Sequence, residues 1–175
     1  MKQLEKNKTQ RGVTLVELMI VIVIGSILAT LAIPSFNEFI SGTRQSSVVS
    51  QLFSDLNRAR SESIKRNARV LVCPRGSDTA CDTSGTTNWN SGWLVCTDAN
   101  SDNACDVGTT ANPNPIVVHS ALHTTLTLTG PNAAVRFNPS GISGSGAATL
   151  TVGGTWSGAT SSIINVAGTG NISRP

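Results

Sequence analysis

The side chains of this sequence that could do chemistry fall into a few groups. A single carboxylate, Glu17, interrupts an apolar run, and oxygen-bearing side chains cluster between Asp98 and Asp106. Four cysteines could form disulfides or bind a soft metal. Neither a G-x-S-x-G nucleophile elbow nor a phosphate-binding glycine loop occurs in the sequence. We therefore predict that the protein is not an enzyme.

The apolar run extends from Val13 to Ile33, 21 residues with Glu17 as their one charge. As a helix it would be about 31 Å long, the thickness of a hydrocarbon core. A carboxylate near the centre of a bilayer costs about 2.5–3.5 kcal/mol, so Glu17 should have a partner. Residues 1–12 carry four basic side chains and one acidic side chain, which predicts a cytoplasmic leader. An ordinary signal anchor with an accidental glutamate is the alternative.

The stretch RGVTLVELMIVIVIGSILATLAIP resembles the N-terminus of type IV prepilins and of the pseudopilins of type II secretion. In that family a basic leader ends in glycine, glutamate is the fifth mature residue, and proline is often the twenty-second. Counting from Val13, Glu17 is fifth and Pro34 is twenty-second. Val13 stands where the family usually has phenylalanine.

This resemblance implies that a prepilin peptidase cleaves after Gly12 and that the new N-terminus at Val13 is methylated. Residues 13–34 would then hold the subunit in the inner membrane as a single pass, with the rest of the chain in the periplasm. In a pilus or pseudopilus, the same helix would pack among those of other pilins. Glu17 would there meet the N-terminal amine of a neighbouring subunit, which offsets the cost of burying both charges.

The pattern of apolar residues predicts one helix from Val13 to Arg66, with Asn67 as its end. Pro34 should bend or break it locally, because proline lacks an amide proton. Residues 35–67 form an amphipathic half whose apolar stripe contains Val48, Val49, Leu52, Phe53, Leu56 and Ala59.

Short runs rich in β-branched residues follow the helix, separated mostly by Gly, Pro or Asn. The expected strands are 69–73, 93–97, 116–119, 126–129, 134–138, 148–152 and 162–167. We predict an α+β, pilin-like fold. The long N-terminal helix packs on a small antiparallel β-rich domain, residues 68–175, that forms one sheet or two small sheets.

Two further stretches resemble the GspH/FimT group of minor pilins and pseudopilins: ARSESIKRNARVLVCP at 59–74 and WNSGWLVCTDANSDNACD at 89–106. This resemblance implies a minor subunit near the filament tip that helps to initiate or cap assembly. Some members of the group are linked to DNA uptake, or competence, through a basic G-R-x-R motif near the C-terminus. Here Gly170 matches, Asn171 replaces the first arginine and Arg174 lies one place beyond the second.

DNA binding depends largely on phosphate neutralisation. Arg174 is therefore a candidate contact, supplemented by Lys65, Arg66, Arg69 and Arg136 if they share a face. Residues 44–75 hold seven basic and two acidic side chains, whereas residues 76–135 hold five aspartates and no Lys or Arg. We favour the interpretation that the basic and the acidic segment neutralise each other over the interpretation that they form two separate binding faces.

The four cysteines, Cys73, Cys81, Cys96 and Cys105, allow three pairings. A location beyond the inner membrane favours disulfides, and separations of eight and nine residues favour Cys73–Cys81 with Cys96–Cys105. The alternative Cys73–Cys96 would link two predicted strands if these are neighbours. Because no C-x-x-C is present and neither histidine is near the cysteines in sequence, we do not expect zinc.

Asp98, Asn100, Asp102 and Asp106 place oxygen atoms at the alternating positions that a calcium loop requires. The EF-hand pattern is incomplete, because no glycine follows Asp102 and Thr109 stands where a glutamate should. Turns capped by Asn and Asp side chains explain the same residues. We favour such turns over calcium and predict no cofactor.

Three functions remain open from the sequence: a minor pilin of a type IV pilus, a minor pseudopilin of type II secretion, and a membrane-anchored enzyme or binding domain that never polymerises. The identity of neighbouring genes would separate the first two. The third requires that Gly12 is not a processing site.

Overall fold

The structure is a computed structural model that describes residues 12–106, 108 and 113–175, and for residues 31–34 the backbone only. The predicted leader therefore lies outside the described residues, apart from Gly12. Two compact units divide the chain, Met1–Phe39 and Ile40–Pro175. The helix α1, Leu15–Arg66, passes from the first unit into the second.

Both ends of α1 are capped. The Thr14 hydroxyl accepts a hydrogen bond from the amide of Glu17 at 3.2 Å, which is the N-terminal half of a capping box. Asn67 adopts a positive φ of 48°, and the amide of Ala68 donates to the carbonyl of Ser63 at 3.2 Å. Such a left-handed residue ends many helices, so Asn67 is the stop that we expected.

Pro34 does not break α1, because the helix is continuous from Leu15 to Arg66. A bend at Pro34 stays a prediction.

In the first unit, α1 exposes its apolar side chains. Its large side chains between Leu15 and Leu28 are 52–73% exposed. Ser26 and Thr30 donate their hydroxyls to carbonyls three residues earlier, at 2.8 and 2.7 Å. This helix is long and apolar enough to cross a membrane by length and composition.

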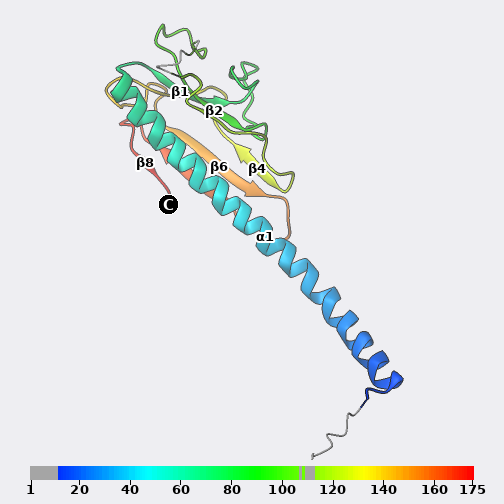
Figure 1. Ribbon diagram of the computed structural model, residues 1–175. Coiled ribbons are helices and arrows are strands. Elements are labelled where there is room, and N and C mark those ends of the chain that lie inside the picture. Colours follow the sequence, from blue (N-terminus) through cyan, green and yellow to red (C-terminus); the bar gives the residue numbers. More distant parts are fainter. Residues whose placement is uncertain (1–11, 107, 109–112) are drawn as a thin grey trace, which may run out of the picture. The chain divides into compact units, whose positions relative to one another are not determined.

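The second unit contains two four-stranded antiparallel sheets beside α1 (Figure 1). The first has the order β3-β2-β1-β5 and is made of Val117–Val118, Trp93–Thr97, Val70–Pro74 and Val135–Phe137. The second has the order β4-β6-β7-β8 and is made of Leu126–Thr129, Ala148–Gly154, Ser162–Val166 and Ile172–Ser173. The α+β fold with two small sheets is thus confirmed, and β8 is a strand that the sequence did not predict.

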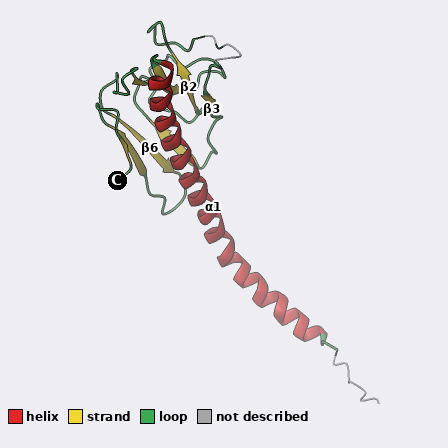
Figure 2. Cartoon of the chain, turned by 60° about the vertical axis from the view of Figure 1, so that its left-hand side comes forward, coloured by secondary structure: helices red, strands yellow, loops and turns green. Residues whose placement is uncertain are grey.

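In the second unit α1 lies against the strands (Figure 2), and the core forms between them. Val49, Leu52, Leu56 and Ala59 are buried there together with apolar residues from both sheets. Every residue of β1 and β2 is buried, although only alternate residues share the core with α1. Loops cover the other face of these two strands, and the disulfides lie on that face.

Candidate functional site

The predicted processing residues lie at the start of α1 in the first unit. Gly12 and Val13 are exposed and precede the helix, and Glu17 lies in its first turn. A negative charge near a helix N-terminus is stabilised by the helix dipole. No residue that the structure describes pairs with the Glu17 carboxylate.

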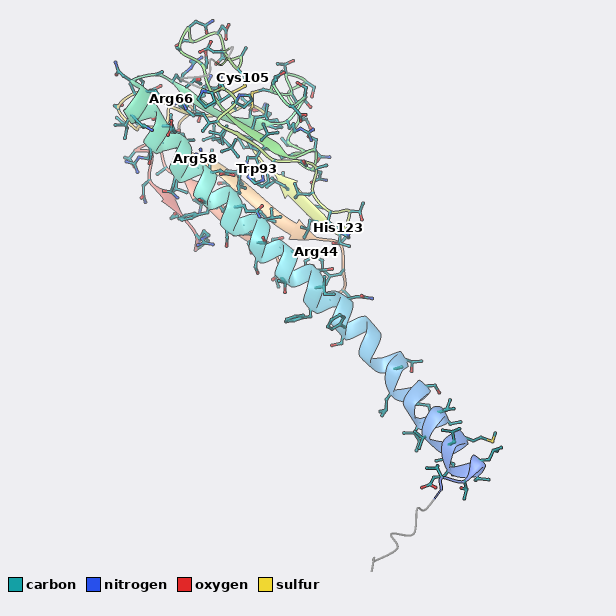
Figure 3. The ribbon with its side chains drawn as sticks, in the orientation of Figure 1. Arg44, Arg58, Arg66, Trp93, Cys105 and His123 are labelled. Atoms are coloured by element: carbon teal, nitrogen blue, oxygen red, sulfur yellow. A yellow bond between two sulfur atoms is a disulfide. The ribbon has the colours of Figure 1, made fainter. Side chains whose placement is uncertain are left out.

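The candidate DNA contacts separate into three places. Arg69 and Arg136 meet at Asn103, whose side-chain oxygen accepts hydrogen bonds from them at 3.2 and 2.9 Å. Lys65 and Arg66 occupy the last turn of α1, where Figure 3 labels Arg66.

Arg174, by contrast, stacks its guanidinium on the ring of Phe53, 4.4 Å from the ring centre. Phe53 lies 13 residues before Arg66 on α1, which is about 20 Å along a helix axis. The five cations therefore do not form one cluster.

Acidic partners neutralise several of these cations. Arg66 lies 2.6 Å and Lys65 lies 3.6 Å from the Glu62 carboxylate. The hydrogen bond from Arg66 lowers the pKa of Glu62 despite its partial burial. Arg69 binds the fully buried Asp98, with its Nε 2.9 Å from Oδ2. Because Arg69 and Asp98 come from the basic and the acidic segment respectively, their pair is an instance of the neutralisation that we favoured.

Amide and guanidinium donors occupy the oxygens of the candidate calcium loop. Asp98 accepts hydrogen bonds from the backbone amides of Asp102 and Asn103 at 3.0 and 3.1 Å. The Asp102 carboxylate accepts from the Ala104 amide and the Asn100 side chain, both at 2.8 Å. The hydrogen bond from the Ala104 amide, and to a lesser extent that from Asn100, lowers the pKa of Asp102.

Asp106 accepts from the amide of Ala99 at 2.6 Å. Turns capped by Asn and Asp side chains, the reading that we favoured, thus account for the residues of this loop, and calcium binding stays the untested alternative. Thr109, the position of the missing glutamate, lies outside the described residues.

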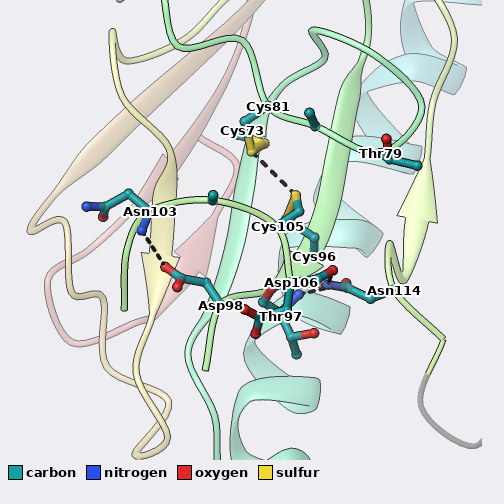
Figure 4. Close-up of a disulfide and its surroundings, with 12 residues drawn as sticks. Cys73, Thr79, Cys81, Cys96, Thr97, Asp98, Asn103, Cys105, Asp106 and Asn114 are labelled. Carbon is teal, nitrogen blue, oxygen red and sulfur yellow. Dashed lines mark hydrogen bonds between the residues drawn. A yellow bond between two sulfur atoms is a disulfide. The ribbon is translucent and has the colours of Figure 1, made fainter. Parts of the chain in front are cut away.

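The structure contains two local disulfides, Cys73–Cys81 and Cys96–Cys105, with Cα–Cα distances of 5.6 and 5.5 Å. The alternative pair Cys73–Cys96 does not form. The two disulfides lie side by side, with Cys81 Sγ 3.7 Å from Cys105 Sγ (Figure 4). All four sulfur atoms lie within 4.8 Å of one another. Spacing along the sequence did not reveal this convergence, because Cys81 and Cys105 come from separate loops.

Sequence reasoning also missed a buried polar cluster. The sequence has no acidic residue close to His119, but α1 supplies Asp55. Its Oδ2 lies 2.7 Å from His119 Nε2 and accepts a 3.0 Å hydrogen bond from Trp93 Nε1. The imidazole of His119 stacks on Trp93, with ring centres 4.2 Å apart.

This cluster borders a surface hollow of about 440 Å³ that His123 and Arg44 also line. Figure 3 labels this pair, and Arg44 Nη1 lies 3.0 Å from His123 Nε2. The cluster joins α1 to the first sheet.

Comparison with known proteins assigns the chain to a family. The family model described as type II transport protein GspH matches residues 48–170. The chain belongs to the GspH family. The model of the prokaryotic N-terminal methylation motif matches residues 7–33, the region in which we placed the prepilin-like features. The resemblance to pilin-like proteins of the GspH/FimT group is thus confirmed, and this family and its fold are structural rather than catalytic.

Known relatives of this GspH-family chain include two fimbrial proteins of Pseudomonas aeruginosa, each 36% identical over 75 residues. The match covers 43% of this chain and 48% of each relative, so the chain spans about half the length of the curated relatives that it matches.

Two crystal structures of the type IV minor pilin FimU of P. aeruginosa share the fold. They have TM-scores of 0.54 and 0.51 at 15% and 16% identity. The alignments cover 78% and 74% of this chain, and 92% and 91% of FimU. These matches confirm a pilin fold.

Proposed function

We propose that this protein is a minor type IV pilin that is anchored in the inner membrane and then assembles into a pilus. The observation that carries the proposal is the apolar half of α1, whose large side chains from Leu15 to Leu28 are more than half exposed. Apolar surface of this extent needs a lipid or protein environment. A bilayer supplies it before assembly, and the helices of neighbouring subunits supply it in the filament.

The chemistry of assembly centres on the start of the helix. Prepilin peptidase cleaves after Gly12, and the new amine at Val13 is methylated. The carboxylate of Glu17, which no described residue of this chain engages, pairs with the N-terminal amine of a neighbouring subunit. Burying either charge alone in an apolar filament core would be costly, so this pairing favours one axial register between subunits.

The second unit faces the periplasm before assembly and the filament surface afterwards. Two disulfides fit an oxidising compartment. As a minor subunit, the protein sits at or near the tip and helps to initiate or cap the filament.

Replacement of Glu17 by glutamine tests the assembly proposal, and Glu38→Gln is the matched control. Both changes remove one carboxylate from the exposed surface of α1, but Glu38 lies outside the apolar run. We expect Glu17→Gln to reach the membrane fraction at normal levels and to be lost from sheared fibres, while Glu38→Gln enters fibres normally. Equal incorporation of both variants would refute the pairing of Glu17 with a neighbouring subunit.

The mass of the mature N-terminus, in cells with and without the peptidase, tests processing. A methylated Val13 that depends on the peptidase is the expected result. An intact Gly12–Val13 bond in normal cells would instead favour the non-polymerising membrane-anchored domain.

A pseudopilin of a type II secretion system is the second candidate function, favoured by the description of the matching family. Deleting the gene distinguishes the two roles. Loss of surface pili with normal secretion of exoproteins supports the pilin, and the reverse supports the pseudopilin.

A contribution to DNA uptake is the remaining part of the proposal. Arg174 lies apart from the cations at the end of α1, and several of those are paired with carboxylates. We therefore expect weak binding that falls steeply between about 50 and 200 mM salt. In a gel-shift assay, Arg174→Ala should weaken binding more than Arg58→Ala, which alters an exposed arginine of α1. Equal binding by both variants would remove Arg174 from the DNA contact.

A further inference from the structure

We propose that the reduced protein binds one zinc ion through Cys73, Cys81, Cys96 and Cys105. The two disulfides of the oxidised protein and this tetrathiolate site are alternative states of the same four sulfur atoms. The argument depends on how closely the four side chains converge and on what holds their backbones in place.

Sulfur atoms of different disulfides lie within 4.8 Å of one another, whereas the two bonded pairs are 1.98 and 2.04 Å apart. Tetrahedral zinc binds thiolate sulfur at about 2.3 Å, which places the sulfur atoms about 3.8 Å apart. Cys81 Sγ and Cys105 Sγ, which belong to different disulfides, lie 3.7 Å apart. No two of the four atoms are farther apart than 4.8 Å. Once the S–S bonds are broken, shifts of about 1–2 Å therefore complete a tetrahedron.

Backbone hydrogen bonds, rather than the disulfides alone, hold the four positions. Cys73 lies on β1 and Cys96 on β2, where the register places them diagonally on one face of the sheet. Beside Cys81, the amide of Asp82 donates to the Pro74 carbonyl at 2.8 Å. Beside Cys105, the amide of Asp106 donates to the Thr97 carbonyl at 2.9 Å. We infer that reduction leaves the four thiols near one another.

The burial of the four cysteines indicates that two of them keep their positions when zinc binds and that the other two can move. Cys73 and Cys96 are buried in strands that lie at the centre of the first sheet, whereas Cys81 and Cys105 are half-buried in loops. The strand cysteines define one edge of the site, and the loop cysteines move to close it. Four thiolate ligands select zinc over harder cations such as magnesium and calcium.

The exchange between the two states is a balanced redox and acid–base reaction. A phosphine and one water reduce each disulfide, giving two thiols and one phosphine oxide. Zinc then displaces one proton from each of the four thiols and forms a tetrathiolate complex of net charge −2. Oxidation of the four thiolates to two disulfides removes four electrons and releases the ion. In the cell, zinc would thus order the strands of a newly exported chain until a periplasmic disulfide carrier oxidises it.

Cobalt(II) titration of the full chain in detergent tests the proposal. The protein is reduced with a phosphine and freed of it without oxygen. We expect one cobalt per chain, with the visible bands of a tetrahedral cobalt–thiolate centre, and complete displacement by one equivalent of zinc. The oxidised protein should show no such bands. Cys105→Ser should weaken zinc affinity at least tenfold, while Ser84→Ala, an exposed change in the loop after Cys81, should leave it unchanged.

A second measurement covers the case in which reduction unfolds the domain. Tryptophan fluorescence then reports whether zinc restores the native signal of the buried Trp89 and Trp93. Zinc should restore that signal in the reduced wild-type chain and not in Cys105→Ser. The absence of tetrahedral bands, a stoichiometry other than one ion per chain, or failure of zinc to restore the fluorescence would overturn the proposal.

Discussion

Asp55 connects α1 to the first sheet, and this connection can be tested by mutation. Its carboxylate is buried, with 7% of the residue exposed. It accepts a hydrogen bond from Trp93 Nε1 and lies 2.7 Å from His119 Nε2. Replacing Asp55 by alanine removes the acceptor and leaves the N–H of Trp93 buried without a partner.

The expected cost follows from these two contacts. A hydrogen bond to a charged group contributes about 1.5–3 kcal/mol, and an orphaned buried donor costs about 1–3 kcal/mol. The side chain of His119 is 28% exposed, so water replaces part of its lost contact. We therefore expect Asp55→Ala to lower the free energy of unfolding by about 3–5 kcal/mol, the range measured when one partner of a buried pair is removed. Asp55→Asn keeps an acceptor and should cost about 1–2 kcal/mol.

Urea unfolding of the detergent-solubilised full chain, followed by tryptophan fluorescence, measures these changes. Asp78→Ala is the matched control, because the Asp78 side chain is 75% exposed in its pair with Arg75 and should cost less than about 1 kcal/mol. In a double-mutant cycle, Asp55→Ala and His119→Ala should couple by about 1–3 kcal/mol. If Asp55→Ala cost no more than Asp78→Ala, the cluster would not be what joins α1 to the sheet.

Other predictions concern packing, backbone geometry and pH. Leu56→Ala empties a fully buried site in the core and should cost about 2–5 kcal/mol in the same urea assay. Gly92→Ala should prevent stable folding, seen as loss of the native fluorescence, because a Cβ there would lie 2.1 Å from the His119 carbonyl oxygen at a φ of +97°. The pKa of Glu62 is lowered, mainly by Arg66, so their pair stabilises the fold above the unfolded pKa of Glu62 and ceases to do so as pH falls through the folded pKa. This increment is about 0.3–0.5 kcal/mol. Arg66→Ala should therefore reduce the difference in the free energy of unfolding between pH 7 and pH 3 by about that amount, and an unchanged difference in that variant would contradict the prediction.

Local patterns in the sequence determined the elements of this protein. The apolar run with Glu17 and the amphipathic stripe through Leu52 and Leu56 predicted one helix, and α1 extends over it from Leu15 to Arg66. Runs of β-branched residues predicted every strand except β8, Ile172–Ser173. The short separation of the cysteines favoured the two disulfides that form. Each of these predictions depends on residues that are close together in the sequence, so it needs no knowledge of the tertiary structure.

Tertiary structure alone decided which chemical groups meet. Asp55 contacts Trp93 and His119, which lie 38 and 64 residues later in the chain. Arg174 lies against Phe53, away from the cations with which the sequence had grouped it. The two disulfides converge because β1 and β2 are neighbours and because separate loops fold over the same face. Such contacts depend on how one helix packs across two sheets, and no periodicity along the chain encodes that packing.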